Sequence, residues 1–327
     1  MKTPLIAWRA VVAAIALTMT MSACSSASTD SAGTGADAAG PEIRIGVGID
    51  ASYAPLFLAD EKGLFEKAGV NVKIVQFGSG GEAADAFAGG QVQFAGLSDV
   101  TTIGRLPQNP DMRALLLYQV DDKYLKVVER KGVSDAKQIK KMGIVPGVSQ
   151  LAAIRFLQSK NIDPKSVKFV TAAPPEIPAL LQKGDIDAFV LWEPWPTKAV
   201  ELGGKIAETT GDFGVLPVHW LVTGAKWLKG NQDTAAKVAK AVDEAATMTE
   251  QDPQAAAQAT QKATKIPAAQ TLTAIKEIQF GARGFTAADL KGYESTAQFY
   301  VATGMAKSAA DVDTAVLQNW FTEHVGK

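Results

Sequence analysis

Two glycine-bearing turns carry the clearest ligand chemistry in the sequence. The turn 78–81 reads Gly-Ser-Gly-Gly and the turn 146–150 reads Pro-Gly-Val-Ser-Gln, and each precedes a helical stretch. Glycines let backbone amides approach an oxyanion, and the first turn of a helix leaves its N–H groups unpaired. Ser79 and Ser149 add hydroxyl donors. The two turns therefore suit a small anion or zwitterion, although a flexible loop or a helix cap has the same composition.

A second candidate combines aromatic rings with a carboxylate. Trp192, Glu193 and Trp195 lie together at the end of a predicted strand. An aromatic face can stack on an apolar or cationic ligand while a carboxylate accepts its hydrogen bonds. The same tryptophans could instead pack in the interior. Further aromatic candidates, which suit the core equally well, are Tyr53, Tyr118 and Trp220.

The chain offers little for catalysis or metal binding. Ser98 and Ser149 lack the final glycine of a nucleophile elbow. His219 has no acidic partner at a recognised spacing, so we expect it to be structural or to lie at a hinge. One cysteine, Cys24, and two histidines are too few for a structural zinc site. We expect no catalytic residue, no metal and no cofactor.

These residues need a scaffold that brings distant turns together. From Pro41 onward, short β-branched runs alternate with amphipathic stretches, which is typical of an α/β fold. Ligands of open α/β sheets bind beyond the carboxyl ends of the strands. The turns at those ends should therefore line one cleft. They are residues 50–53, 78–81, 98–101, 146–150, 173–176 and 192–193.

The alternating pattern runs twice along the chain, and after Trp220 the β signals stop in favour of Ala-rich helices. We expect two α/β lobes, the second inserted into the first. Lobe I should comprise residues 41–121 and a mostly helical return, 219–327, and lobe II residues 122–218. Two crossing segments should then join the lobes and form a hinge.

The first forty residues predict a signal for export and a flexible attachment to the membrane. Lys2 and Arg9 precede a short apolar run that ends in Met-Ser-Ala-Cys at Cys24, which resembles a bacterial lipobox. Residues 1–23 are thus expected to be a lipoprotein signal peptide, with a lipid attached to Cys24. Ordinary signal cleavage that leaves a spare thiol is the alternative. Residues 24–40 should form a flexible linker, because they contain almost nothing to bury.

The overall composition excludes some classes of partner. The 327 residues carry 33 Lys and Arg against 34 Asp and Glu, a formal charge of −1, and 47% are hydrophobic. A nucleic-acid binder would show a basic surplus, so we expect no nucleic acid. The apolar content is enough for the cores of two domains.

Three segments in order resemble the substrate-binding proteins of nitrate-, sulfonate- and taurine-type ABC importers. They read YAPLFLADEKGLFEKAGV from Tyr53, AFAGGQVQFAGLSD from Ala86 and LLQKGDIDAFVLWEP from Leu180. The resemblance implies a two-lobed periplasmic-binding-protein-like fold of type II, with a helical C-terminal segment packed on lobe I. It also implies a protein outside the cytoplasm, anchored to the membrane by its lipid. Such a protein closes its lobes on a small organic anion or zwitterion and delivers it to a permease and ATPase.

Together with the turns, the resemblance selects the candidate ligand-binding residues, and we expect a monomer. The residues are Asp50, Ser52, Tyr53, Pro55, Ser79, Gly80, Ser98, Asp99, Ser149, Gln150, Trp192 and Glu193. Two other functions stay open. One is an enzyme on the same scaffold, like the thiamine-pyrimidine synthases, although their cysteine-rich signature is absent. The other is a sensor whose closed lobes contact a receptor.

Overall fold

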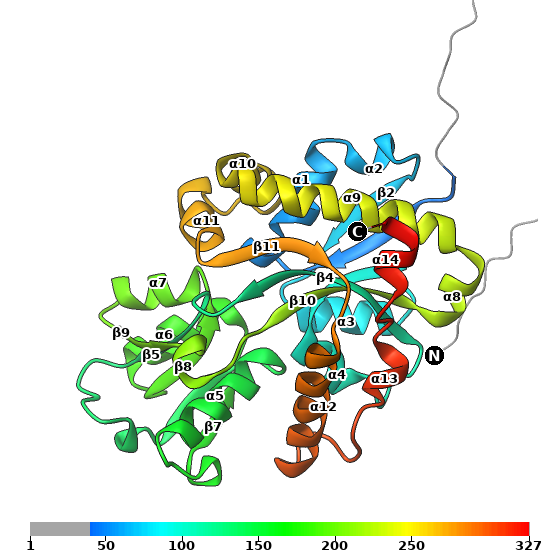
Figure 1. Cartoon of the computed structure of the whole chain (residues 1–327). Coiled ribbons are helices and arrows are strands. Elements are labelled where there is room, and N and C mark those ends of the chain that lie inside the picture. Colours follow the sequence, from blue (N-terminus) through cyan, green and yellow to red (C-terminus); the bar gives the residue numbers. More distant parts are fainter. Residues whose placement is uncertain (1–39, 327) are drawn as a thin grey trace, which may run out of the picture. The chain divides into compact units, whose positions relative to one another are not determined.

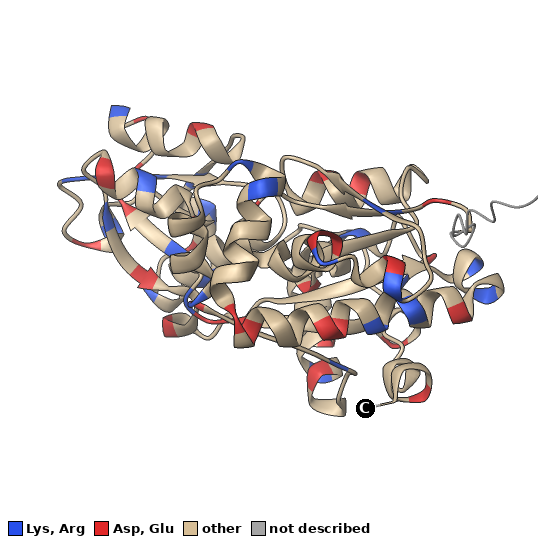
Figure 2. Ribbon diagram, turned by 90° about the horizontal axis from the view of Figure 1, so that it is seen from above, with Lys and Arg blue, Asp and Glu red and all other residues tan. Residues whose placement is uncertain are grey.

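The computed structural model describes residues 40–326. The expected signal peptide at 1–23, the expected lipid site at Cys24 and nearly all of the expected linker at 24–40 lie outside these residues. No helix among residues 40–326 combines the length and the apolar character needed to cross a membrane. Lys, Arg, Asp and Glu are intermixed along the ribbon (Figure 2), in keeping with the formal charge of −1.

The strands of the described residues form two mixed sheets (Figure 1). The first sheet has the order β11-β4-β10-β3-β1-β2, with β1 parallel to β2 and β3, and β10 antiparallel to β3 and β4. We call this sheet and its helices lobe I. Its strands are β1 Ile43–Val47, β2 Val72–Gln76, β3 Phe94–Ser98, β4 Met112–Asp121, β10 Val218–Gly224 and β11 Ile278–Arg283.

The second sheet has the order β7-β6-β8-β5-β9, and we call it and its helices lobe II. Strands β6, β7 and β8 are parallel neighbours, and β5 runs antiparallel to β8 and β9. Its strands are β5 Leu125–Glu129, β6 Lys141–Ile144, β7 Lys168–Thr171, β8 Ala188–Trp192 and β9 Lys205–Thr209. The chain enters lobe II between β4 and β5 and returns to lobe I between β9 and β10.

Helices cover both faces of the sheet in lobe I, because the strand side chains alternate between two apolar layers. Phe94 of β3 packs on the side of α1 and α9, whereas Ala95 and Leu97 pack on the side of α3, α4 and α12. The lobe I helices are α1 Ala54–Glu61, α2 Leu64–Lys67, α3 Gly80–Ala88, α4 Asp99–Arg105, α8 Ala225–Gly230, α9 Gln232–Gln251, α10 Pro253–Thr264, α11 Ala268–Ile275, α12 Ala287–Ala302, α13 Val312–Ala315 and α14 Trp320–Val325.

Lobe II carries fewer helices, and short 3-10 turns occur in both lobes. The lobe II helices are α5 Val148–Ser159, α6 Ile177–Lys183 and α7 Trp195–Glu201. The 3-10 turns are η1 Ala51–Tyr53, η2 Ala136–Gln138, η3 Pro164–Ser166, η4 Pro174–Glu176 and η5 Thr210–Phe213.

The expectation that β structure stops after Trp220 was wrong. Strand β10 continues to Gly224 as a fully buried central strand, and β11 follows the Ala-rich helices. Strand β11 pairs on one side only, with β4, and exposes alternate residues. Its short, partly polar sequence therefore gives a weak strand signal. Strand β9, also at a sheet edge, is likewise short and partly polar, so it gives a weak signal as well.

Two helical stretches of the sequence are interrupted in the structure. The stretch from Tyr53 to Lys67 forms two helices, α1 and α2, which separate at Gly63, whose φ of 62° lies in the left-handed region. The stretch 311–324 breaks into α13 and α14, because Val316 forms a bridge to Ala114 of β4. The C-terminal segment thus packs on lobe I, as expected, but it contributes a strand and a bridge as well as helices.

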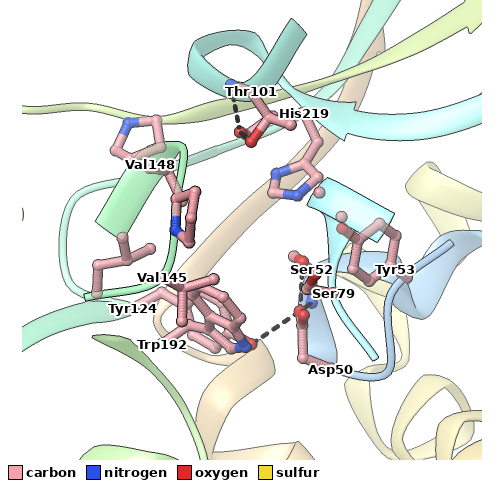
Figure 3. Close-up of a pocket in the computed structure, with 16 residues that line it drawn as sticks. Asp50, Ser52, Tyr53, Ser79, Thr101, Tyr124, Val145, Val148, Trp192 and His219 are labelled. Carbon is pink, nitrogen blue, oxygen red and sulfur yellow. Dashed lines mark hydrogen bonds between the residues drawn. The ribbon is translucent and has the colours of Figure 1, made fainter. Parts of the chain in front are cut away.

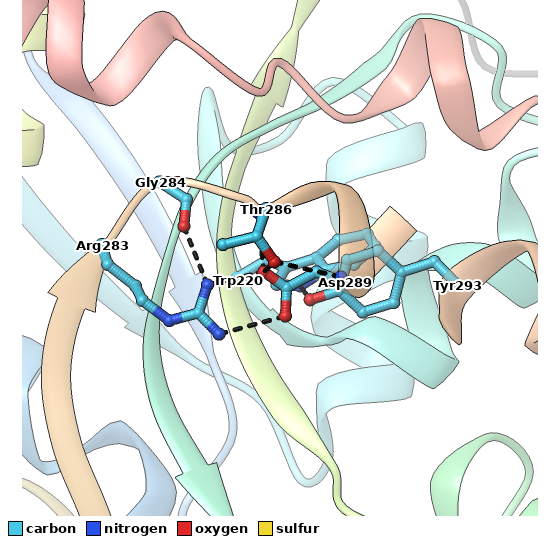
Figure 4. A network of polar contacts seen from close by, with 6 residues as sticks. All are labelled: Trp220, Arg283, Gly284, Thr286, Asp289 and Tyr293. Atoms are coloured by element: carbon cyan, nitrogen blue, oxygen red, sulfur yellow. Dashed lines mark hydrogen bonds and ion pairs between the residues drawn. The ribbon is translucent and has the colours of Figure 1, made fainter. Parts of the chain in front are cut away.

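The turn from β11 into α12 is fixed by a polar network (Figure 4). Thr286 is the N-cap of α12, and the Asp289 carboxylate accepts the Thr286 amide at 2.7 Å. Arg283 forms two contacts with the same carboxylate, at 2.6 and 3.0 Å. These bonds hold the pKa of Asp289 below its usual range despite burial, and the bond to Asp289 raises the pKa of Arg283 in return. The network fixes α12 beside lobe I.

Candidate ligand-binding site

A pocket lies between the two lobes, where the carboxyl ends of β1, β3 and β8 meet (Figure 3). Its free volume is about 30 Å³, enough for about two water molecules. The lobes are therefore close together in this structure. The residues that line the pocket are Asp50, Ser52, Tyr53, Ser79, Gly80, Gly81, Ser98, Thr101, Tyr124, Leu125, Val145, Pro146, Val148, Trp192, Pro217 and His219.

Asp50 forms the floor of the lobe I side. It is the N-cap of η1, and its Oδ1 accepts the Ser52 amide at 2.9 Å and the Ser52 hydroxyl. The same Oδ1 accepts the Tyr124 hydroxyl at 3.0 Å, a bond that crosses from the start of lobe II to lobe I. Burial raises the pKa of Asp50, while the bonds from Ser52 and Tyr124 oppose that rise.

The N-terminus of α3 also faces the pocket. Ser79 is its N-cap and accepts the Glu82 amide at 3.3 Å. The amides of Gly80 and Gly81 have no hydrogen-bond partner among residues 40–326. A larger residue at position 80 would displace the Tyr53 side chain, because a Cβ there would lie 2.6 Å from the hydroxyl of Tyr53. The expected anion-binding turn thus keeps two free N–H groups beside the pocket.

The third turn, at α4, uses its hydroxyls internally. Ser98 is the N-cap of α4, accepts the Thr101 amide at 3.1 Å and donates to the Thr101 hydroxyl at 2.8 Å. Thr101 in turn lies next to Gly147 of lobe II, where a Cβ would be 2.8 Å from the Thr101 Oγ1. The two lobes therefore meet closely at this point.

His219 contributes an imidazole from β10. Burial lowers its pKa to about 3, so the ring is neutral near pH 7. The side-chain amide of Gln119 lies 2.5 Å from the imidazole Nδ1. The ring meets Tyr53 edge-on, with centroids 5.3 Å apart. His219 is thus a neutral, polar ring at the pocket.

The lobe II wall is mainly aromatic and apolar. Trp192 at the end of β8 is buried, with 9% of its surface exposed. The Tyr124 hydroxyl lies 3.1 Å from the carbonyl oxygen of Glu193 as well as 3.0 Å from Asp50. Val145, Pro146 and Val148 complete this wall. A ligand here would contact flat, apolar surfaces on one side and polar groups on the other.

Five of the candidate residues do not line the pocket, and three of them, Pro55, Ser149 and Gln150, bond or pack within their own lobes. The Ser149 hydroxyl accepts the Val145 amide at 3.0 Å and donates to the Val190 carbonyl at 2.6 Å, so it joins α5 to the sheet. The backbone N–H of the neighbouring Gln150 donates to the Val145 carbonyl. Pro55 is buried at the start of α1. These positions serve the structure of their lobes in this arrangement.

Glu193 faces a buried ion cluster instead of the pocket. Its Oε1 lies 2.6 Å from the ammonium of Lys126, which also lies 2.6 Å from Glu277. Lys126 and Glu193 belong to lobe II, whereas Glu277 precedes β11 in lobe I. The side chains of Lys126 and Glu193 are 8% and 7% exposed. This cluster therefore links the lobes by charge.

Asp99 lines a neighbouring cavity of about 550 Å³ rather than the pocket. Its carboxylate accepts the Val218 amide at 3.2 Å, and burial raises its pKa to about 7. Arg155 of α5 reaches the same cavity and stacks on Phe299, 3.9 Å from the ring centroid. Pro217 lines both spaces.

The sequence did not single out Thr101, Tyr124 or His219 as ligand residues, although Thr101 lies in a predicted turn. Tyr124 lies in the crossing segment between β4 and β5, and His219 lies inside a buried strand. Neither residue lies at the carboxyl end of a strand, where ligands of open α/β sheets are expected to bind. They were therefore not selected from the sequence as ligand residues. The sequence does predict that the chain crosses between the lobes near both residues, and this expectation could have identified them as candidates.

Residues 36–264 match the model of the NMT1-like family. The chain belongs to this family. Two individual proteins are also similar to this chain in sequence. The taurine-binding periplasmic protein of Escherichia coli is 29% identical over 188 residues, 55% of this chain and 58% of that protein. The nitrate/nitrite binding protein NrtA of Synechococcus elongatus is 26% identical over 281 residues, 71% of this chain and 63% of that protein. The chain thus spans less than two thirds of either relative.

The fold of the family is also found among solved structures. The alkanesulfonate-binding protein SsuA of Xanthomonas axonopodis pv. citri, bound to MOPS, superposes with a TM-score of 0.75 at 15% identity. The match covers 84% of this chain and 97% of SsuA. The expected two-lobed, periplasmic-binding-protein-like α/β fold is confirmed, as is the resemblance to sulfonate, taurine and nitrate binding proteins.

Proposed function

We propose that this protein is the solute-binding component of an ABC importer and captures a small organic anion or zwitterion by closing its lobes. The observation that carries the proposal is the pocket itself, whose walls come from both sheets and which the Tyr124–Asp50 bond crosses. A solute held there touches both lobes only when they are closed, so it stabilises the closed state. The names of the relatives, which bind taurine, nitrate and nitrite, support this function.

The same proposal includes a location and partners. The protein would lie outside the cytoplasm, held to the membrane by a lipid on Cys24, with lobe I at 41–121 and 219–327 and lobe II at 122–218. It would act as a monomer and deliver its solute to a permease and ATPase. No covalent chemistry on the solute is needed, because binding and release are sufficient for transport. We therefore propose a binding protein rather than an enzyme.

Calorimetric titration of the purified protein with taurine, ethanesulfonate, nitrate and aromatic acids tests the proposal. We expect saturable binding of at least one compound, together with a smaller radius of gyration in X-ray scattering. Tyr124→Phe should weaken that binding about tenfold or more, because it removes a hydrogen bond to a buried carboxylate.

Tyr300→Phe is the matched control. The Tyr300 hydroxyl donates to the Val100 carbonyl at 2.9 Å within lobe I, and Tyr300 does not line the pocket. It should therefore bind solute like the wild type. Absence of saturable binding to every compound, or a solute that is chemically turned over, would contradict the proposal.

A further inference from the structure

Asp50 keeps one carboxylate oxygen for a ligand. Its Oδ1 accepts every hydrogen bond that Ser52 and Tyr124 give to this side chain. Oδ2 has no partner among the described residues, although only 6% of the residue is exposed and it lines the pocket. A carboxylate oxygen that is largely shielded from water and has no protein partner costs free energy. A hydrogen-bond donor or a cation in the pocket would remove that cost.

The protein supplies no cation for this oxygen. None of the described residues that line the pocket is Lys or Arg, and His219 is neutral. The nearby Lys126 is held between Glu193 and Glu277, at 2.6 Å from each. Any positive partner of Asp50 therefore comes from the ligand.

The pocket also presents donors that need an acceptor. The free amides of Gly80 and Gly81 begin the nine-residue helix α3, whose N-terminus favours negative charge. The pocket thus offers one unpaired acceptor and two unpaired donors, and the rings of Tyr124 and Trp192 also line it.

We propose that Asp50 determines specificity and that the solute is a zwitterion, with an ammonium or other N–H-bearing cation on Asp50 Oδ2 and its anionic group at the N-terminus of α3. This inference rests on the proposed function and narrows its solute class. A bare anion such as nitrate or an alkanesulfonate would leave Asp50 unpaired. The protein should therefore discriminate against such anions, unlike a site built only for a sulfonate or nitrate group.

Calorimetry with matched pairs of compounds that differ only in an amino group tests this inference. The pairs are taurine with ethanesulfonate, β-alanine with propanoate, 4-aminobutanoate with butanoate, and 4-(aminomethyl)benzoate with 4-methylbenzoate. In each pair that binds, the amine-bearing member should bind about tenfold or more tightly, as expected for a hydrogen bond to a charged group. The wild-type comparison needs no variant.

Asp50→Asn then assigns the preference to this side chain. Asparagine retains an acceptor for Ser52 and removes the charge, so the preference within each pair should largely disappear. Asp121→Asn is the control, since Asp121 is equally buried in lobe I but lines neither cavity. It should keep the wild-type preference.

The outcomes separate the two proposals. Equal or tighter binding of the members without an amine, or an unchanged preference in Asp50→Asn, would overturn the role of Asp50 while leaving solute capture intact. Failure of every compound in both panels to bind would contradict the proposed function and this inference with it.

Discussion

At the scale of single residues, the pocket separates side chains by where they point. Ser79 and Ser149 both lie beside the first turn of a helix after a strand, yet Ser79 lines the pocket and Ser149 bonds to Val145 and Val190 inside lobe II. Sequence position predicts the turn but not the direction of the hydroxyl. Seven of the candidates line the pocket: Asp50, Ser52, Tyr53, Ser79, Gly80, Ser98 and Trp192. Their contact with a ligand remains a prediction.

Asp121 is a second buried carboxyl, and it affects stability rather than recognition. Neither of its oxygens has a hydrogen-bond partner in the described part of the chain. Burial, together with Asp99, Asp122, Asp50 and Glu277, raises its pKa well above 3.8. The folded state therefore holds this proton more tightly than the unfolded state, so its contribution to stability is lost as pH rises above about 4.

Asp121→Asn should therefore stabilise the protein at neutral pH. We expect a gain of about 1–3 kcal/mol at pH 7, because the variant removes a buried carboxyl without partners. The gain should shrink as pH falls toward 4. Urea unfolding of both proteins across this pH range measures the difference. A variant that is less stable at pH 7, or a gain that grows on acidification, would refute this account.

At the scale of elements, most strands of the two sheets were predictable, and the antiparallel edge strands β9 and β11 were not. The runs that became β1, β5 and β8 are β-branched or apolar and bounded by turn residues, so their pattern alone indicates strands. Strands β9 and β11 lie at sheet edges, and β11 interrupts a series of Ala-rich helices. Pairing with β4 determines that β11 is a strand, and a local pattern carries no information about that distant partner.

The ion cluster that joins β5 to the start of β11 should hold the lobes together. Glu277→Gln removes the charge that crosses between the lobes but leaves the Lys126–Glu193 pair within lobe II. We expect the ligand-free variant to populate a more open state, with a larger radius of gyration in X-ray scattering, and to bind its solute about threefold to tenfold more weakly.

Glu201→Gln is the control for this prediction. Glu201 pairs with Lys198 on α7, where both side chains are 54% exposed, so the pair contributes little. Glu201→Gln should match the wild type in scattering and in binding. Identical behaviour of the two variants would show that the cluster does not hold the lobes closed.

At the scale of the described molecule, closure depends on how nearly the lobes can approach. Gly147 lies against Thr101 across the gap and has a φ of 105°. Gly147→Ala should act as a wedge, because its Cβ would lie 2.8 Å from the Thr101 Oγ1. We expect weaker solute binding and a larger radius of gyration. The positive φ adds a cost of about 1–2 kcal/mol in stability.

Gly203→Ala separates the wedge from the backbone strain. Gly203 also lies in lobe II with a φ of 94°, but nothing lies within 4 Å of its Cβ position. This variant should lose similar stability while closing and binding normally. If both variants bind solute equally weakly, strain rather than lobe contact would account for the effect.

The two crossings have a consequence for how such a molecule can be built. Strands β4 and β10 are antiparallel neighbours, with Val120 opposite Val218 and the Asp121 amide bonded to the Pro217 carbonyl at 3.0 Å. Without lobe II, β4 and β10 would form an ordinary β-hairpin that a short turn could close. Lobe II is thus an insertion at the tip of a β-hairpin of lobe I. Replacing lobe II with a different domain at the same two crossings would preserve the hydrogen bonds between β4 and β10. The result would be a chimera in which half of the binding site is new.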